Sequence, residues 1–394
     1  MVAESGVEPV RIHPEQIGHT KARIAVLGNG LAGLAAADYL QRDGYHVNIF
    51  GTPRSPLPAD FHYLQHNQIE PAWRFPFQWY PRASDLDLGD PKIMAIVKAS
   101  ATALMELRKD NRYDTLGGKY SSLRLVDKFD LMGDGQEIPP DLKNLFKNVG
   151  GMEVEEFDVP RCEAAEILGV THGYHFRTMA VNGSYLVSAL ERRFLNNHGW
   201  YDYKTIESLD QLKGKFDVVL DCMGLAAKKL FPDLPLYPVK GVELLFPYAG
   251  LDYIASAGPA IIATRPGTTK TVVSALALPP GEFQSNEPTD EEETKTIRMI
   301  DAMVAIPGVF PRLLKDEWNS VKHRAEWAER TDDIQNKVVR VSAMRPGADK
   351  FIVSASREGD MVVAHSNGWR GEGMVAFGAP SVLEAEIKTL LNLR

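Results

Sequence analysis

A glycine-rich turn between a strand-like segment and a helix-forming segment constrains this chain more than any other feature. Residues 23–27 (RIAVL) form a short β-prone run in which the four residues after Arg23 are apolar and partly β-branched, as a buried strand requires. Gly28, Gly30 and Gly33 follow with the spacing G-x-G-x-x-G, and the alanine- and leucine-rich residues 34–42 come next. This order of strand, turn and helix is the phosphate-binding unit of dinucleotide-binding folds.

Each glycine of the turn has its own physical reason. Gly28 permits the tight turn, Gly30 lets backbone N–H groups approach a pyrophosphate, and Gly33 lets the helix pack closely on the strand. Leu31 and Ala32 lie between the second and third glycines and are candidate cofactor-binding residues, and the helix N-terminus beyond them supplies partial positive charge for phosphates. We therefore expect this segment to bind a dinucleotide.

The acid that usually holds the adenosine ribose is missing. An Asp or Glu is expected about 18–20 residues after the third glycine. Residues 50–54 read FGTPR instead, which leaves Thr52 as the candidate partner of the ribose and Arg54 as a candidate phosphate ligand. Since that acid is a main determinant of NAD binding, its absence argues against a plain NAD-dependent dehydrogenase.

Length and composition indicate an ordinary globular protein of about two domains. The 394 residues are 44% hydrophobic and 24% charged, and the formal net charge of −8 argues against a nucleic-acid-binding surface. The two cysteines, Cys162 and Cys222, indicate neither a disulfide framework nor a metal site. The first 20 residues lack the apolar core of a signal peptide, and no apolar run is long enough to span a membrane, so we expect a cytoplasmic protein.

The order of predicted elements indicates a discontinuous α/β fold. Helices are predicted over 92–109, 289–306 and 383–393, and strands over 241–246, 260–264, 271–278, 337–343, 351–355 and 361–365. We expect a Rossmann-like nucleotide-binding domain and a second α+β substrate domain on a mixed or antiparallel sheet. The nucleotide-binding domain is assigned to residues 21–55, 181–232 and 340–394, the second domain to 56–180 and 233–339, and an N-terminal extension to 1–20.

A second glycine-rich segment, HSNGWRGEGMVAFG (365–378), lies between an apolar strand sequence and the last helix. Gly368, Gly371, Gly373 and Gly378 fall within these fourteen residues. Because glycine costs conformational entropy on folding, their density predicts a close approach of the backbone to a ligand or to another element.

Several separated segments resemble the FAD-dependent D-amino-acid oxidase superfamily, which includes glycine and sarcosine oxidases. HSNGWRGEGM resembles the family's H-x-x-G-x-G-G-x-G-(Leu/Met) loop before its last helix. VNGSYLVSALERRF (181–194) resembles the start of the helix before the adenine-contacting strand, and DVVLDCMGLAA (217–227) resembles the strand with the (Cys/Ala)-x-Gly turn. Arg345-Pro346 resembles an Arg-Pro pair upstream of the last loop.

The resemblance implies noncovalent FAD, because no cysteine lies near the last loop. It places Ile206 near the adenine and the glycine-rich backbone against the flavin pyrimidine, with the last helix adding positive potential. The residues that the resemblance places at the cofactor are Ile206, Cys222, Met223, Gly224, Arg370, Gly371, Glu372, Gly373 and Met374.

The resemblance also implies oxidation of the C–N bond of a small amine or amino-acid-like substrate, by hydride transfer to flavin N5 with oxygen as acceptor. Near Ile352 the sequence lacks the arginine with which amino-acid oxidases hold the substrate carboxylate, and His365 is expected to be structural. No catalytic residue is assigned, and a homodimer is possible. The candidates near the substrate are Tyr174, Arg177, Arg345, Trp369 and Arg370.

Three alternatives stay open at this point. An FAD-dependent monooxygenase using NAD(P)H generally has a Gly-Asp pair before its last flavin contact, where this chain reads AHSNG. The second alternative, an NAD-dependent dehydrogenase, would leave the C-terminal glycine loop unexplained. A flavin-binding protein without turnover is compatible with Val375, which stands where the family often has threonine.

Overall fold

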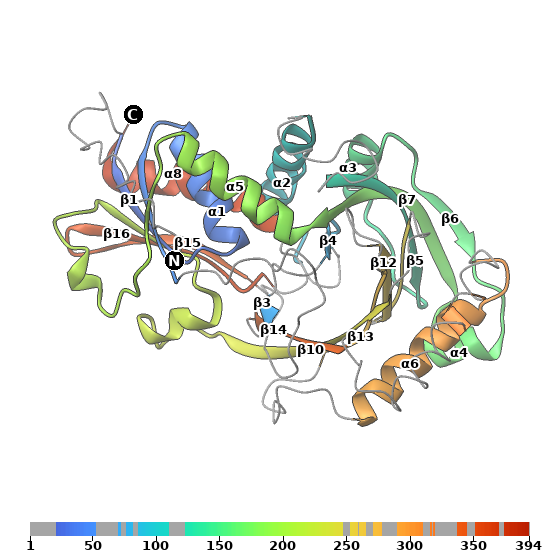
Figure 1. The fold of residues 1–394 in the computed structure, drawn as a ribbon. Coiled ribbons are helices and arrows are strands. Elements are labelled where there is room, and N and C mark those ends of the chain that lie inside the picture. Colours follow the sequence, from blue (N-terminus) through green and yellow to red (C-terminus); the bar gives the residue numbers. More distant parts are fainter. Residues whose placement is uncertain are drawn as a thin grey trace, which may run out of the picture.

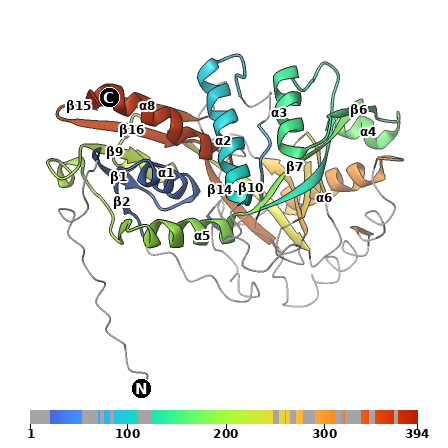
Figure 2. The same cartoon turned by 90° about the horizontal axis from the view of Figure 1, so that it is seen from above.

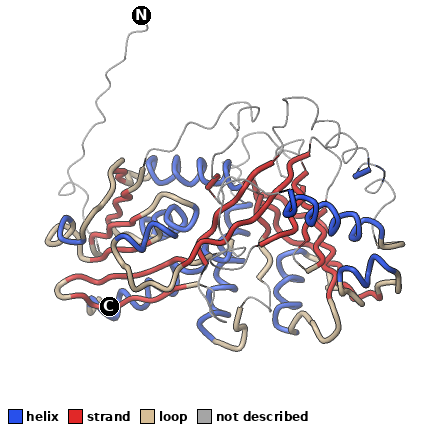
Figure 3. The backbone as a smooth tube through the Cα atoms, turned by 90° about the horizontal axis from the view of Figure 1, so that it is seen from below, coloured by secondary structure: helices blue, strands red, loops and turns tan. Residues whose placement is uncertain are grey.

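The computed structural model describes most of the chain as two mixed β-sheets flanked by helices (Figures 1 and 3). The predicted α/β class with a mixed second sheet is confirmed. The described residues are 21–52, 70–71, 76–81, 86–109, 123–246, 253–258, 260–264, 271–277, 290–309, 316, 318–319, 337–344, 351–369 and 374–393.

The smaller sheet has the strand order β15-β16-β9-β1-β2-β8. Five of its strands run parallel, so their carboxyl ends meet at one edge, and β15 is antiparallel at the border. In a sheet of this kind, ligands bind outside the carboxyl ends of the strands. Its strands are β1 (Arg23–Leu27), β2 (His46–Phe50), β8 (Trp200–Asp202), β9 (Val218–Asp221), β15 (Ile352–Glu358) and β16 (Met361–Asn367).

Helix α1 (Leu31–Arg42) packs between α5 (Gly183–Asn196) and α8 (Ala379–Leu391) beside the small sheet (Figure 2). The predicted last helix begins four residues earlier than expected, because Pro380 is tolerated in a first helical turn. It ends at Asn392, whose φ of 55° is left-handed. The sequence after Gly224 (LAAKKL) also predicts a helix, but there the chain forms only a short 3-10 helix, η6 (Gly224–Lys229).

The larger sheet has the order β3-β14-β10-β13-β12-β11-β5-β7-β4, with β6 paired to β7. Pairs β5–β7 and β10–β14 are antiparallel, and β5–β11 is parallel. Its strands are β3 (Glu70–Pro71), β4 (Pro76–Gln78), β5 (Leu123–Met132), β6 (Glu155–Asp158), β7 (His172–Asn182), β10 (Tyr237–Phe246), β11 (Tyr253–Ala257), β12 (Ala260–Thr264), β13 (Thr271–Ala277) and β14 (Lys337–Met344).

Side chains of β5 alternate between the two faces of the large sheet. Phe129 and Leu131 face the cluster built with α4 (Glu163–Leu168) and α6 (Asp290–Ala305). The intervening residues face the other way, because successive side chains of a strand point to opposite faces. On that side α3 (Pro140–Gly150) stacks Phe146 on Phe176 at 4.4 Å between ring centroids.

Helix α2 (Pro91–Lys109) joins the two halves of the fold, since it contacts α8 and the 3-10 helix η7 (Val375–Gly378) as well as α3 and β5 (Figure 2). The predicted helix over 92–109 is confirmed. The predicted domain limits at 181 and 340 fall inside β7 and β14, both of which belong to the large sheet. The division into domains itself stays a prediction.

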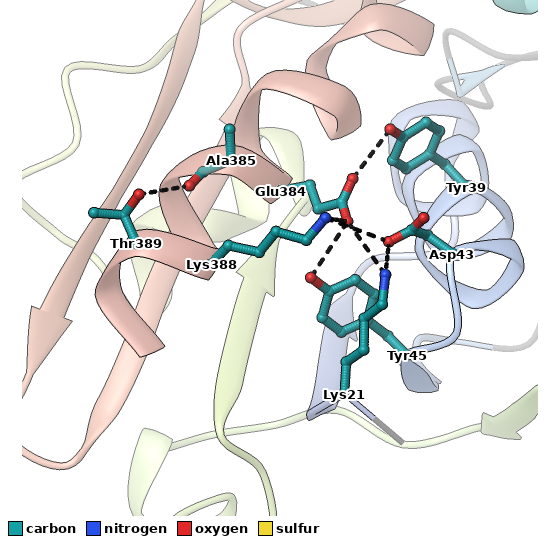
Figure 4. A network of polar contacts seen from close by, with 8 residues as sticks. All are labelled: Lys21, Tyr39, Asp43, Tyr45, Glu384, Ala385, Lys388 and Thr389. Carbon is teal, nitrogen blue, oxygen red and sulfur yellow. Dashed lines mark hydrogen bonds and ion pairs between the residues drawn. The ribbon is translucent and has the colours of Figure 1, made fainter. Parts of the chain in front are cut away.

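A polar cluster ties α8 to α1 at the end remote from the glycine turn (Figure 4). Glu384 is buried and accepts hydrogen bonds from Tyr39 Oη at 3.1 Å and Tyr45 Oη at 3.4 Å, while Lys388 Nζ lies 2.6 Å from its carboxylate. Burial, and then the charge of Glu384, raise the pKa of Tyr39 to about 12. Both phenols therefore remain protonated donors in the physiological range.

Arg23 and Asp217 join the starts of β1 and β9, and they give the fold a measurable pH dependence. Although partial burial opposes it, hydrogen bonds from the Arg23 side chain and N–H lower the pKa of Asp217 below its usual 3.8. A lowered folded-state pKa stabilises the protein above pH 3.8, and this stabilisation is lost as pH falls through the folded value. We expect Asp217→Asn to unfold at lower urea concentration than wild type at pH 6, with the gap closing below pH 3.8. A gap that is constant across this range would contradict the assignment.

Candidate cofactor-binding site

The glycine turn after β1 leaves no room for side chains at two positions. Gly28 has φ of +101°, and a Cβ there would lie 2.6 Å from Cys222 O. A Cβ at Gly33 would lie 2.0 Å from Gly28 O, which is far inside van der Waals contact. The turn is therefore held between α1 and the residues that follow β9.

Gly30 is different, because a Cβ at that position would meet no atom of the described residues within 4 Å, its chain neighbours aside. It is the N-cap of α1, with extended backbone and no side-chain cap. The first N–H groups of an α-helix have no partner within the helix, so the amides of Leu31, Ala32 and Gly33 face this open space. The helix dipole adds positive potential there. The cradle fits a pyrophosphate.

Asn29 connects this turn to the end of β2, a role that was not predicted. Its Nδ2 donates to Thr52 O at 2.8 Å. A Cβ at Gly51 would lie 2.7 Å from Asn29 Cγ, so the glycine is needed where the two segments touch. Thr52 is exposed beside this contact. Arg54, the other predicted ligand of this segment, lies outside the described residues.

The turn after β9 lies directly against the glycine turn. Cys222 N donates to Leu27 O at 2.8 Å, and Gly224 adopts a left-handed φ of 60°. Cys222 is buried, whereas Met223 is half-buried. Burial, followed by the neighbouring charge of Asp221, raises the pKa of the Cys222 thiol well above its usual value. Cys222 is thus a packing residue.

This burial predicts a difference in thiol reactivity. With excess Ellman's reagent at pH 8, only half-buried Cys162 of the native protein should react, which releases about one equivalent of thionitrobenzoate from the reagent. In the unfolded protein both cysteines should react and release about two equivalents. The Cys162→Ser variant is the matched control and should release almost none until it is unfolded. Rapid release of two equivalents from native wild type would contradict the buried position of Cys222.

Three consecutive residues at the end of β16 bind the β9 turn. Asp221 is fully buried, and its Oδ2 lies 2.5 Å from Asn367 Nδ2 and 3.0 Å from His365 Nδ1. Asn367 Oδ1 accepts the Gly224 N–H at 2.8 Å. The Ser366 hydroxyl is hydrogen-bonded to the Cys222 thiol. Asp221, Ser366 and Asn367 were not predicted, although polar residues at the carboxyl ends of apolar parallel strands are a usable signal.

The last loop begins with contacts that the sequence did not predict. Trp369 stacks on Phe351 with ring centroids 4.3 Å apart, and its indole N–H donates to Ser366 Oγ at 3.1 Å. Met374 is fully buried. A Cβ at Gly378 would lie 1.8 Å from Ile96 O, so this glycine permits the approach of α2. The candidates Arg345, Arg370, Gly371, Glu372 and Gly373 lie outside the described residues.

Two substrate candidates lie well inside the large sheet. Tyr174 is buried, and Lys143 Nζ lies 4.7 Å from its ring centroid. Arg177 Nε lies 3.8 Å from Asp127 Oδ1. Tyr174 is eight residues before Asn182, where β7 leads into α5, and this is about 26 Å of extended strand. The structure does not bring either residue to the glycine turn.

Ile206 packs under the carboxyl edge of the small sheet, in a cluster with Leu27, Phe50 and Leu212. Together the described residues form one continuous edge, with the glycine turn, the end of β2, the Cys222–Gly224 turn and the end of β16. Within the part of the chain that the structure describes, no group of three or more His, Cys, Asp and Glu side chains could hold a metal ion. No helix there is long and apolar enough to cross a membrane.

The fold and this edge are those of a dinucleotide-binding protein that also has a second, larger sheet. A family model described as DAO, FAD dependent oxidoreductase, matches residues 23–371. The chain belongs to this FAD-dependent oxidoreductase family. It is an enzyme whose cofactor is FAD, and the predicted resemblance is confirmed.

Similar solved structures cover nearly the whole chain. Iminodiacetate oxidase from Chelativorans sp. BNC1 is 15% identical with a TM-score of 0.59, over 94% of this chain and 96% of that one. Glycine oxidase from Geobacillus kaustophilus is 13% identical with a TM-score of 0.57, over 93% and 95%. At such identities the likeness shows the fold. Human D-aspartate oxidase is 29% identical over 97 residues, which are 25% of this chain and only 28% of the human protein.

Proposed function

We propose that this enzyme oxidises the C–N bond of a small amine or amino-acid-like substrate and passes the electrons to molecular oxygen. The observation that carries the proposal is the open cradle at Gly30, which lies beside the ends of β9 and β16 in a chain of the FAD-dependent oxidoreductase family. Iminodiacetate oxidase, glycine oxidase and D-aspartate oxidase are named for substrates in which carbon is bonded to nitrogen.

The residues of the edge divide the binding of FAD among them. The amides of Leu31, Ala32 and Gly33 would hold the pyrophosphate, Thr52 and, outside the described residues, Arg54 are the candidates for the ribose side, and Ile206 would support the adenine. The Cys222–Gly224 turn would line the dinucleotide, and the backbone of residues 371–375, most of which lie outside the described residues, would lie against the flavin pyrimidine. Bound flavin supplies a hydride acceptor at N5. The protein contributes orientation and electrostatic stabilisation.

The cofactor is held noncovalently, because residues 365–378 contain no cysteine and Cys222 is buried. Arg345 and Arg370 remain the candidates for a substrate carboxylate, since a guanidinium binds carboxylates through two parallel hydrogen bonds. Tyr174 and Arg177, which lie in β7 of the large sheet, stay sequence predictions of residues near the substrate. The cytoplasmic location and the homodimer stay predictions.

The proposal is tested on purified protein in two steps. Absorbance bands at about 370 and 450 nm should appear, and after acid precipitation they should leave with the supernatant. Air-equilibrated enzyme should then consume oxygen with a panel of small amines and amino acids, releasing one peroxide per oxygen. Flavin that NAD(P)H reduces while every amine fails would point to a monooxygenase. Flavin that no donor reduces would point to a binding protein without turnover.

A further inference from the structure

The buried contact between Asp221 and Asn367 has a fixed direction. The backbone N–H of Gly224 can only donate, so the amide oxygen of Asn367 must face it, 2.8 Å away. The amide nitrogen of Asn367 then points at Asp221 Oδ2. The other oxygen, Asp221 Oδ1, accepts the Met223 N–H at 3.0 Å. Both oxygens at position 221 must therefore be acceptors.

A carboxylate meets this requirement and an amide does not. With asparagine at position 221, the new NH₂ group would face either the Met223 N–H or the amide nitrogen of Asn367, whichever way it is turned. Turning Asn367 as well only moves the mismatch to the Gly224 N–H. Since Asp221 is fully buried and Asn367 is 1% exposed, water cannot readily replace the lost partner.

We propose that Asp221 and Asn367 are positioning residues of the FAD site. They hold the turn after β9 in register with the end of β16, from which the last glycine loop departs. Two segments 144 residues apart, from Asp221 to His365, are thereby fixed as one surface beside the cradle. The inference rests on the proposed function, because it concerns how the protein presents both segments to FAD.

The arrangement predicts an unusual rescue. In the exchange variant D221N/N367D, the amide at 221 would donate to the carboxylate at 367, and its oxygen would still accept the Met223 N–H. The carboxylate at 367 would still accept the Gly224 N–H. His365 can accept a hydrogen bond from the new amide in its other neutral tautomer, because Nδ1 is then an acceptor. Every backbone donor thus keeps an acceptor, and the bond that the exchange removes is the long one from Asn367 Nδ2 to Asp221 O at 3.3 Å.

The experiment compares apoproteins of wild type, D221N, N367D and D221N/N367D. FAD affinity is measured by quenching of flavin fluorescence, thermal stability is measured without FAD, and the flavin midpoint potential is measured in each holoprotein. We expect each single variant to bind FAD about tenfold more weakly or worse, with a shifted potential, and the exchange variant to return within about threefold of wild type. Asp43→Asn, at the opposite end of α1, is the matched control and should bind FAD as wild type does.

Single variants with wild-type affinity and potential would overturn the inference, as would a folded exchange variant that binds FAD no better than they do. If the single variants do not fold, the FAD affinity of the exchange variant is compared with that of wild type alone. An affinity within about threefold of wild type supports the inference, and a weaker one overturns it. Stability lost in the apoprotein without any change in FAD affinity or potential would show a purely structural contact, and would overturn it too. Wild-type protein that takes up no FAD would contradict the proposed function, which the other outcomes leave standing.

Discussion

Gly30→Ala is expected to lower FAD affinity about 100-fold, or about 2.7 kcal/mol, in a protein that stays folded. Among the described residues, a Cβ at Gly30 would touch no atom within 4 Å beyond its chain neighbours, and the φ of −73° is open to alanine. The added methyl group would instead fill the space in front of the first amides of α1, where we place the pyrophosphate. The variant therefore separates binding from folding.

Gly33→Ala is the matched comparison, since its Cβ would lie 2.0 Å from Gly28 O. Helix α1 must then move away from the turn, so both FAD affinity and the stability of the apoprotein should fall. Fluorescence titration with FAD and urea unfolding of the two apoproteins measure these effects. Wild-type FAD affinity in Gly30→Ala would show that the pyrophosphate lies elsewhere.

Lys128→Ala is expected to destabilise the protein by about 3–5 kcal/mol. Lys128 is fully buried in β5, with its ammonium hydrogen-bonded to Ser256 and 3.7 Å from Asp130 Oδ1. It also lies 4.9 Å from the centre of the Tyr80 ring, and the Tyr80 hydroxyl donates to Asp130. Removal of the lysine leaves the buried Asp130 carboxylate without its cation and opens a cavity.

Two further variants separate the charge from the cavity. Lys128→Met keeps most of the buried stem and removes the charge, so it should remain strongly destabilised. Lys128→Met combined with Asp130→Asn removes both charges and should recover part of the loss, because the amide oxygen still accepts a hydrogen bond. The free energy of unfolding of all three variants is measured by urea unfolding, with tryptophan fluorescence as the signal. A loss below about 1 kcal/mol in Lys128→Ala would show that the pair contributes little.

Local signals explain which elements could be predicted. The segment from β1 to β2 combines strand, glycine turn and helix within 28 residues, from Arg23 to Phe50, so its sequence carries the whole unit. Strand β12 was predicted with its observed limits, Ala260–Thr264, because a short apolar run is bounded by residues that interrupt it. The turn at Gly28 carries its own local signal, whereas Gly224 was placed at the cofactor by the family resemblance, and both cofactor assignments stay predictions.

Elements with buried polar groups could not be predicted. Strand β5 reads LRLVDKFDLM, and its buried Lys128 and Asp130 break the apolar alternation that would mark it. Their partner Ser256 is 128 residues away from the lysine, so nothing local shows that the charges are satisfied. Gly378 was predicted to approach a ligand or another element, and only the structure identifies Ile96 of α2 as its neighbour. The Asp221–Asn367 contact joins positions 146 residues apart and was missed for the same reason.

The most direct test of amine oxidation by this FAD-dependent enzyme is anaerobic mixing with candidate substrates. We expect at least one small amine or amino acid to bleach the band at about 450 nm, and readmitted oxygen to restore it with release of peroxide. The hydroxy acid that matches the reactive amino acid serves as the control and should leave the band unchanged. Flavin that no amine bleaches, but that NAD(P)H reduces, would contradict the account.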